Sequence, residues 1–139
     1  MIKTIDVKSG ETAGLYQYLS AAVTPRPIAF VSTIDAEGNK NLSPFSFFNV
    51  FSVNPPILVF SPVRRVRNNT SKHTLDNVHQ VKECVISLVT EEIAQQVSLA
   101  SCDFDSATNE FEKAGLTEVK SDLITPSRIK ESPINFECK

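Results

Sequence analysis

Short β-rich segments divided by turn residues are the feature of this sequence that most restricts its fold. Turn signals stand between the first three segments, at Gly38-Asn39 and at Asn54-Pro55-Pro56. The helical patterns do not alternate with the strands in a regular βαβ order. We therefore expect a mainly β fold, a small and mostly antiparallel barrel with short peripheral helices, rather than a doubly wound parallel sheet. The predicted strands cover residues 28–34, 42–53, 57–60, 83–89 and 134–138, and the apolar run at 57–60 predicts a buried strand.

Four short helices are predicted beside these strands. Apolar residues at helical spacing place the first before Pro25, and Gly115 ends the last. In the third helix, Ile93, Val97 and Ala100 are expected to face inward. The predicted helices cover residues 15–22, 74–81, 91–102 and 109–114.

The size and charge of the chain restrict what it can bind. Its 139 residues predict one domain, residues 1–139, which is long enough to bury a core without disulfides. The net charge of -2 gives no reason to expect a nucleic acid or an anionic membrane as partner. No apolar segment is long enough to cross a bilayer.

Cysteine and histidine usage does not indicate a metal centre. The three cysteines, Cys84, Cys102 and Cys138, are widely spaced and form no CxxC pair, so reduced thiols in a cytoplasmic protein are expected. Cys84 and Cys138 lie in predicted strands, where we expect buried and unreactive thiols. His73 and His79 are not spaced with carboxylates in a metal-binding pattern.

Residues 41–49 combine aromatic and polar side chains within one predicted strand. Pro44 removes a donor from the strand ladder, so we expect this part of the strand to be an edge, a bulge or a loop entry. Main-chain N–H groups left free there could bind the polar edge of a planar ring, with phenylalanines as apolar walls. A kinked core strand remains the alternative interpretation.

A second candidate site joins the loop after residue 60 to the start of the helix at residue 74. Hydroxyl groups and cations flank that helix start, where unpaired N–H groups favour a phosphate monoester. A solvated basic loop with a capping Ser or Thr is the alternative. The residues concerned are Ser61, Arg64, Arg65, Ser71, Lys72, His73 and Thr74. Arg26, held between Pro25 and Pro27, gives a third candidate binding residue. The alternative is an exposed side chain in a rigid connection.

Taken together, these segments resemble the flavin reductase-like family, whose members have an FMN-binding split β-barrel. The order and spacing of the motifs carry the resemblance, which covers nearly the whole chain. Within this family, the chain looks similar to flavoredoxin and to the flavin reductase components of two-component monooxygenases. The matching stretches are residues 24–33, 41–49, 55–61, 72–77, 109–117 and 131–138.

The resemblance implies an FMN site with a ring half at residues 41–46 and a phosphate half at Ser61 and residues 72–74. Family members usually have Asp at the position of His73, and their domains continue past Lys139 with further strands. We therefore expect a barrel that lacks its later strands and has an open edge. The candidate cofactor-binding residues are Arg26, Thr33, Asn41, Leu42, Ser43, Pro44, Phe45, Ser46, Phe60, Ser61, Arg64, Arg65, Lys72, His73 and Thr74.

The same resemblance implies an oxidoreductase that transfers hydride from NAD(P)H to FMN and supplies the reduced flavin to an acceptor such as a monooxygenase. A homodimer is expected. Because the cofactor carries the chemistry, no catalytic acid–base pair is expected among the side chains. Two alternatives remain open: a flavin-binding electron carrier without NAD(P)H activity, and a split barrel that has lost the cofactor.

Overall fold

The computed structural model describes residues 4–8, 12–65, 69–105 and 108–139. Its centre is an antiparallel sheet with the strand order β2-β1-β5-β8. Two separate hairpins pair β3 with β4 and β6 with β7. The described strand pairings are all antiparallel, which confirms the predicted mainly β fold. The strands are β1 (Ala29–Ile34), β2 (Lys40–Phe45), β3 (Phe48–Val53), β4 (Pro56–Phe60), β5 (Cys84–Leu88), β6 (Glu118–Val119), β7 (Arg128–Ile129) and β8 (Asn135–Cys138).

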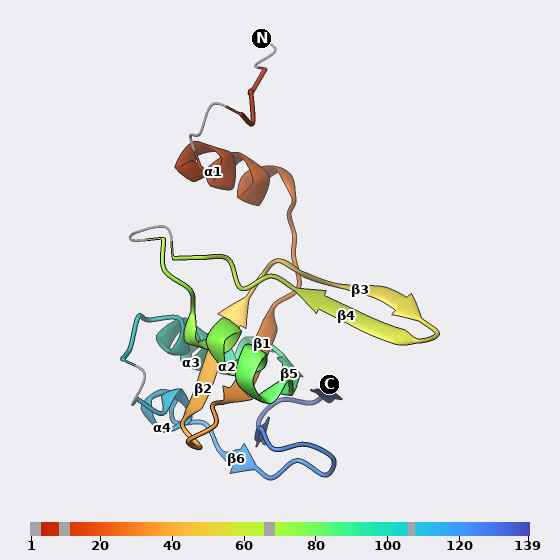
Figure 1. Ribbon diagram of the computed structural model, residues 1–139, viewed down its shortest axis with the longest axis vertical. Coiled ribbons are helices and arrows are strands. Elements are labelled where there is room, and N and C mark those ends of the chain that lie inside the picture. The colour runs from red at the N-terminus through yellow and green to blue at the C-terminus, as the bar shows by residue number, and fades with distance from the viewer. Residues whose placement is uncertain (1–3, 9–11, 66–68, 106–107) are drawn as a thin grey trace.

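The central sheet packs on both faces, because β1 lies between β2 and β5 and alternates its side chains between two clusters. Phe30 and Leu42 join one cluster, which α3 (Ala94–Ala100) and α4 (Glu110–Ala114) cover (Figure 1). Residues of the other face pack with Val78 of α2 (His73–Val81) and with the hairpin β3–β4; that cluster is Ala29, Val31, Phe45, Cys84 and Ile86.

The predicted helices are confirmed, with small shifts at their ends. The helix expected over residues 91–102 is a short 3-10 turn, η1 (Glu91–Ile93), followed by α3, and it buries Ile93, Val97 and Ala100 as expected. At α4, the Asn109 side chain accepts a hydrogen bond from the N–H of Phe111 (Oδ1···N 3.1 Å). Gly115 ends that helix with φ +68°, a conformation that favours glycine.

The hairpin β3–β4 corrects the expectation of a buried strand over residues 57–60. Ile57 and Val59 are each 42% exposed, because the hairpin projects from the central sheet and only part of one face packs on it (Figure 1). Phe48, Leu58 and Phe60 make that contact. Of the positions expected for Pro44, the structure shows the edge, because Pro44 lies within the edge strand β2. The strand predicted over residues 42–53 is divided beyond it, since β2 ends at Phe45 and β3 begins at Phe48.

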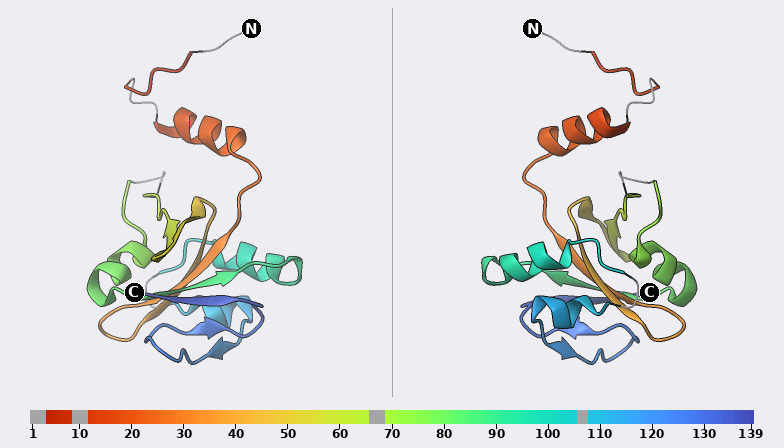
Figure 2. Two further views of the ribbon diagram at one scale, coloured as in Figure 1. Left: turned by 90° about the vertical axis from the view of Figure 1, so that its right-hand side faces the viewer. Right: turned by 90° about the vertical axis from the view of Figure 1, so that its left-hand side faces the viewer.

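Helix α1 (Thr12–Ala22) stands apart from the sheet and reaches it through an extended connection (Figures 1 and 2). Arg26 ties this connection together by donating from Nη1 to the carbonyl oxygens of Ser20 and Val23. The Tyr16 ring lies 5.9 Å from the Phe47 ring, centroid to centroid, which brings α1 to the end of β2. Within the described residues, none of the helices is long and apolar enough to span a membrane.

Candidate functional site

The polar and aromatic run at residues 41–46 forms most of β2, the edge strand of the central sheet. The N–H of Leu42 points away from β1, because it donates to the Glu110 carboxylate (N···Oε2 3.0 Å). Alternate residues of an antiparallel strand share a direction, so Pro44 takes the next outward position, where its missing N–H costs no ladder bond. In this register the N–H groups of Ser43 and Phe45 face β1 and Pro44 has none, so β2 offers no main-chain donor to a ligand over residues 43–45.

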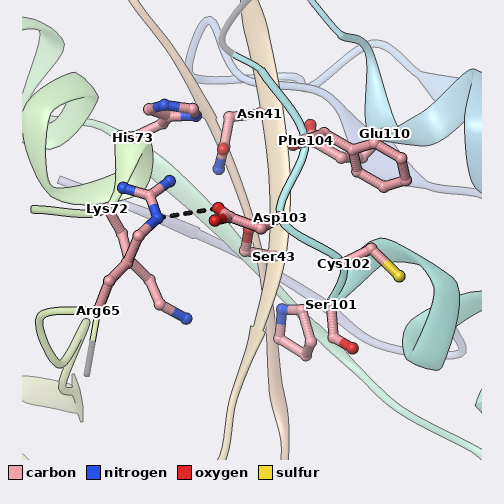
Figure 3. Close-up of a pocket in the computed structure, with 11 residues that line it drawn as sticks. Asn41, Ser43, Arg65, Lys72, His73, Ser101, Cys102, Asp103, Phe104 and Glu110 are labelled. Carbon is pink, nitrogen blue, oxygen red and sulfur yellow. Dashed lines mark hydrogen bonds and ion pairs between the residues drawn. The ribbon is translucent and has the colours of Figure 1, made fainter. Parts of the chain in front are cut away.

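A pocket of about 270 Å³ opens where β2, the start of α2 and the segment after α3 meet (Figure 3). We call it the larger pocket. Its lining residues come from β2, from the loop before α2 and the start of that helix, and from the segment between α3 and α4, as expected of a site built on connections around a sheet. It is lined by Asn41, Ser43, Pro44, Arg65, Lys72, His73, Ser101, Cys102, Asp103, Phe104 and Glu110.

A second pocket of about 100 Å³, the smaller pocket, lies on the α1 side of β2. Pro44 and Lys72 line both pockets, so the two adjoin at these residues. The smaller pocket is more aromatic than the larger one. Its lining residues are Tyr16, Pro44, Phe45, Ser46, Phe47, Ser61, Val63 and Lys72.

Lys72 is the half-buried cation at the junction of the two pockets. Its ammonium nitrogen lies 4.9 Å from the centre of the Phe45 ring, and among the described residues it forms no ion pair with a carboxylate. Burial lowers the pKa of Lys72, the positive charge of Arg65 lowers it further, and Asp103 opposes this effect. A desolvated cation without a carboxylate partner favours an anionic ligand.

Arg65 approaches Lys72 from the loop before α2. Its Nε donates to Asp103 Oδ1 at 2.9 Å, an ion pair that spans the larger pocket (Figure 3), and its Nη1 donates to the carbonyl of Ser71. Lys72 itself is the N-cap of α2 and makes no side-chain capping bond. The start of α2 and these two cations therefore lie together at the larger pocket, a combination that favours an anion.

A buried polar network behind the pocket fixes α2 on the sheet. Asn41 donates from Nδ2 to Thr74 Oγ1 (2.9 Å) and to Thr33 Oγ1 (3.5 Å), and Asn77 donates to the same Thr33 oxygen (3.2 Å). Thr33 and Thr74 are almost completely buried. These four side chains connect the N-terminal half of α2 to β1 and β2.

The remaining predicted residues lie at different distances from the two pockets. His73 lines the larger pocket at the start of α2. Leu42 is fully buried in the core, and the Phe60 ring packs 5.4 Å from that of Phe45 without lining either pocket. Arg64 is exposed and donates to the carbonyl of Asn69 in its own loop (Nε···O 2.8 Å).

Arg26 reaches the site only at its edge. Its Nε donates to Ser46 Oγ (3.3 Å), and its guanidinium carbon lies 5.6 Å from the centre of the Phe47 ring. Arg26 therefore supports the loop that lines the smaller pocket and does not itself line either pocket.

Sequence reasoning missed one wall of the larger pocket. Residues 101–104 follow α3 and bring Asp103 to Arg65, and Glu110 at the start of α4 brings a buried carboxyl to the N–H of Leu42. Nothing in their local spacing indicates a ligand site. Only the apolar face of α3, which packs this helix against β2, could have placed the following segment near the site.

A comparison with family models matches residues 21–139 to the flavin reductase like domain. Among curated proteins, an uncharacterized protein of Aquifex aeolicus is 44% identical over 133 residues, covering 96% of this chain and 67% of that protein. An uncharacterized protein of Halalkalibacterium halodurans is 40% identical over 124 residues, covering 89% of this chain and 59% of that protein.

Solved structures give the same match. The nitrilotriacetate monooxygenase component B from Bacillus cereus has a TM-score of 0.91 at 28% identity, over 99% of this chain and 67% of that one. The 2-nitrobenzoate 2-nitroreductase NbaA of Pseudomonas fluorescens has a TM-score of 0.81 at 31% identity, over 99% of this chain and 64% of that one. The chain thus spans about two thirds, or less, of the length of these proteins.

Proposed function

The chain belongs to the flavin reductase-like family, and on that premise we propose that it binds FMN and transfers hydride to it from NAD(P)H. The observation that carries this proposal is the position of Lys72, a half-buried cation without a carboxylate partner among the described residues, at the junction of two pockets on the edge strand β2. When bound, FMN would supply the redox chemistry, and the protein would supply orientation and electrostatics.

The phosphate of FMN would lie between Lys72, Arg65 and the first N–H groups of α2. A phosphate monoester carries more negative charge than each phosphate of a dinucleotide, and two adjacent cations suit that charge. Ser61 adds a hydroxyl donor on the smaller-pocket side. Arg64 is the weaker candidate of the two loop arginines, because it is exposed and lines neither pocket, whereas Arg65 lines the larger pocket.

The ring of FMN would lie along β2, with Pro44 and Phe45 as apolar contacts and the hydroxyls of Ser43 and Ser46 at its polar edge. The N–H of Ser46 would stabilise negative charge that develops at that edge, because a fixed donor costs no reorganisation during the reaction. Asn41, Thr33 and Thr74 would keep α2 and β2 at the spacing that the cofactor needs.

We further propose NAD(P)H as the electron donor, an acceptor such as a monooxygenase, and a homodimer. The match to the flavin reductase like domain and the nitroreductase NbaA support the first, and the nitrilotriacetate monooxygenase component B supports the second. Exposed apolar side chains on the hairpin β3–β4 support the third. A cytoplasmic location accords with free thiols at all three cysteines.

The phosphate assignment is tested by comparing FMN with riboflavin, which lacks the phosphate. We expect Lys72→Met to weaken FMN binding about tenfold or more and riboflavin binding about twofold or less, since a lost charge-assisted bond is worth roughly 1.5–3 kcal/mol. Quenching of flavin fluorescence on titration measures both affinities. Arg64→Met is the matched control and should leave both nearly unchanged. Equal losses of the two ligands in Lys72→Met would refute the assignment.

The reaction itself is tested by following NADH and NADPH oxidation with FMN present. Oxidation of either nucleotide above the rate of free FMN supports the reductase. FMN binding without such oxidation would identify an electron carrier instead. A colourless protein that does not bind added FMN would exclude both.

A further inference from the structure

Two cysteines lie directly opposite each other at the end of the central sheet. Cys84 begins β5 and Cys138 ends β8, and the antiparallel register pairs the two residues. Both side chains belong to the cluster that packs on the α2 face of the sheet, so both point to the same side. Cys84 is buried, whereas Cys138 is only half-buried, which corrects the expectation that both thiols are buried.

The register brings the two thiols within reach of a disulfide. Leu88 donates to the carbonyl of Ile134 (N···O 3.0 Å), so alternation along the strands makes Cys84 and Cys138 a hydrogen-bonded pair as well. Such pairs have their Cα atoms about 5.5 Å apart, which lies inside the range that a disulfide spans.

Solvent reaches the pair on the side of Cys138. Both cysteines line a groove of about 710 Å³ between the hairpin β3–β4 and the β5–β8 edge of the sheet. Neither cysteine lines the larger or the smaller pocket, so this pair is separate from the proposed flavin site. Cys102, the third cysteine, lies at the larger pocket and has no cysteine opposite it.

We propose that Cys84 and Cys138 are a redox-responsive thiol pair that closes to a cross-strand disulfide by exchange with a small-molecule disulfide such as oxidised glutathione. The more accessible Cys138 attacks one sulfur of the small disulfide as a thiolate, and one small thiol leaves. Cys84 then loses its proton and attacks Cys138 Sγ, and the second small thiol leaves. Two electrons and two protons thus pass from the protein thiols to one small disulfide.

Electrostatics agrees with this order of attack. A hydrogen bond from Cys84 lowers the pKa of the Cys138 thiol, and the same contact together with burial raises the pKa of Cys84. The half-buried thiol therefore reacts first, and the buried one resolves the mixed disulfide.

Closure would join β8 covalently to β5 across a loop that runs from residue 84 to residue 138. A link over such a long loop restricts the unfolded chain, so the oxidised form should melt about 5 °C or more above the reduced form. Reversible closure, rather than a permanent structural link, fits a protein expected in a reducing compartment.

The test treats the purified chain with oxidised glutathione, alkylates the remaining thiols and maps the peptides by mass spectrometry. We expect a Cys84–Cys138 linked peptide, alkylation of Cys102, and recovery of all three thiols after dithiothreitol. Thermal unfolding of the oxidised and reduced forms gives the second readout.

Two variants serve as controls. Cys102→Ser should still form the link and show the increase in melting temperature, whereas Cys138→Ser should show neither. Alkylation of Cys84 and Cys138 in the oxidised wild-type protein would overturn the proposal. A disulfide that includes Cys102 would overturn it as well.

Discussion

Asp103 neutralises one of the two cations at the larger pocket and would compete with an incoming phosphate. It pairs with Arg65 at 2.9 Å while Lys72 forms no ion pair among the described residues, so the bound anion would have to share Arg65 with a carboxylate. Asp103→Asn should strengthen FMN binding about twofold to fivefold, a small factor because the Asp103 side chain is 68% exposed and solvent screens the pair. Riboflavin affinity should stay unchanged.

Fluorescence titrations at low and high salt measure this effect, which should shrink as salt screens the charges. The matched control is Asp122→Asn, because Asp122 forms a similar exposed ion pair with Arg128 (2.8 Å) far from both pockets. An Asp103→Asn variant with weaker FMN binding would mean that the carboxylate positions Arg65 for the phosphate.

Glu110 makes stability depend on pH. Burial raises the pKa of its carboxyl above the ordinary value of 4.5, although the N–H of Leu42 partly opposes this. A carboxyl whose pKa is raised by folding contributes stability that is fully present below pH 4.5 and is lost as the pH rises through the raised value. Glu110→Gln cannot ionise, so its stability relative to the wild type should increase over that window.

Urea unfolding at several pH values between acid and neutral measures the difference. Glu112→Gln, an exposed change on the same helix, should follow the wild-type profile. A constant difference between Glu110→Gln and the wild type across the window would contradict the prediction.

At the scale of elements, α1 depends on Arg26 for its attachment. An 11-residue helix is marginal alone, and Arg26 both caps its last carbonyls and contacts Ser46 at the end of β2. Arg26→Met should therefore raise amide hydrogen exchange in α1 by about fivefold to tenfold, with little change in the melting temperature of the core. Exchange measured by mass spectrometry tests this.

Arg64→Met provides the comparison, since Arg64 bonds only within its own loop among the described contacts. Exchange in α1 that stays at the wild-type rate in Arg26→Met would show that other contacts, such as that between Tyr16 and Phe47, hold the helix.

The elements that sequence reasoning found are those with a strong local pattern. Pro44 indicated an edge position, and β2 is an edge strand whose outward position tolerates the missing N–H. The hairpin β6–β7 was missed, because its two-residue strands are too short to show a period. The exposure of β4 was also missed, since an apolar run does not tell how many of its faces find a partner.

The same limit applies to the candidate site. Sequence reasoning proposed Lys72 and residues 41–46 because their local stretches carry unusual chemistry, and the structure brings Lys72, Asn41 and residues 43–46 together at the two pockets. Asp103 was not, because its pairing with Arg65 joins residues 38 positions apart and depends on how α3 packs. Thr74 was expected to bind the ligand directly, whereas its hydroxyl lies buried against Asn41, a contact that only the three-dimensional register reveals.

At the scale of the whole molecule, five exposed apolar side chains are gathered on the hairpin β3–β4: Val50, Phe51, Val53, Ile57 and Val59. Val50, Phe51 and Val53 are the most exposed of them, and such a patch on a projecting hairpin is typical of a protein interface. We propose that a second copy of the chain covers this patch, which would then be the interface of the proposed homodimer. Phe51, at 70% exposed, is the largest of these side chains and therefore the best candidate for an anchor in that interface.

Phe51→Asp should weaken dimerisation about a hundredfold or more. The change removes an aromatic ring that the proposed interface would bury and leaves a carboxylate that dimerisation would have to desolvate. Sedimentation velocity over a range of concentrations gives the monomer–dimer equilibrium. Leu123→Asp is the matched control, since Leu123 is similarly exposed at 76% but lies away from the hairpin. A wild-type chain that is monomeric at every concentration would contradict the homodimer. If Leu123→Asp dissociated the dimer and Phe51→Asp did not, the interface would include the loop between β6 and β7 instead of the hairpin.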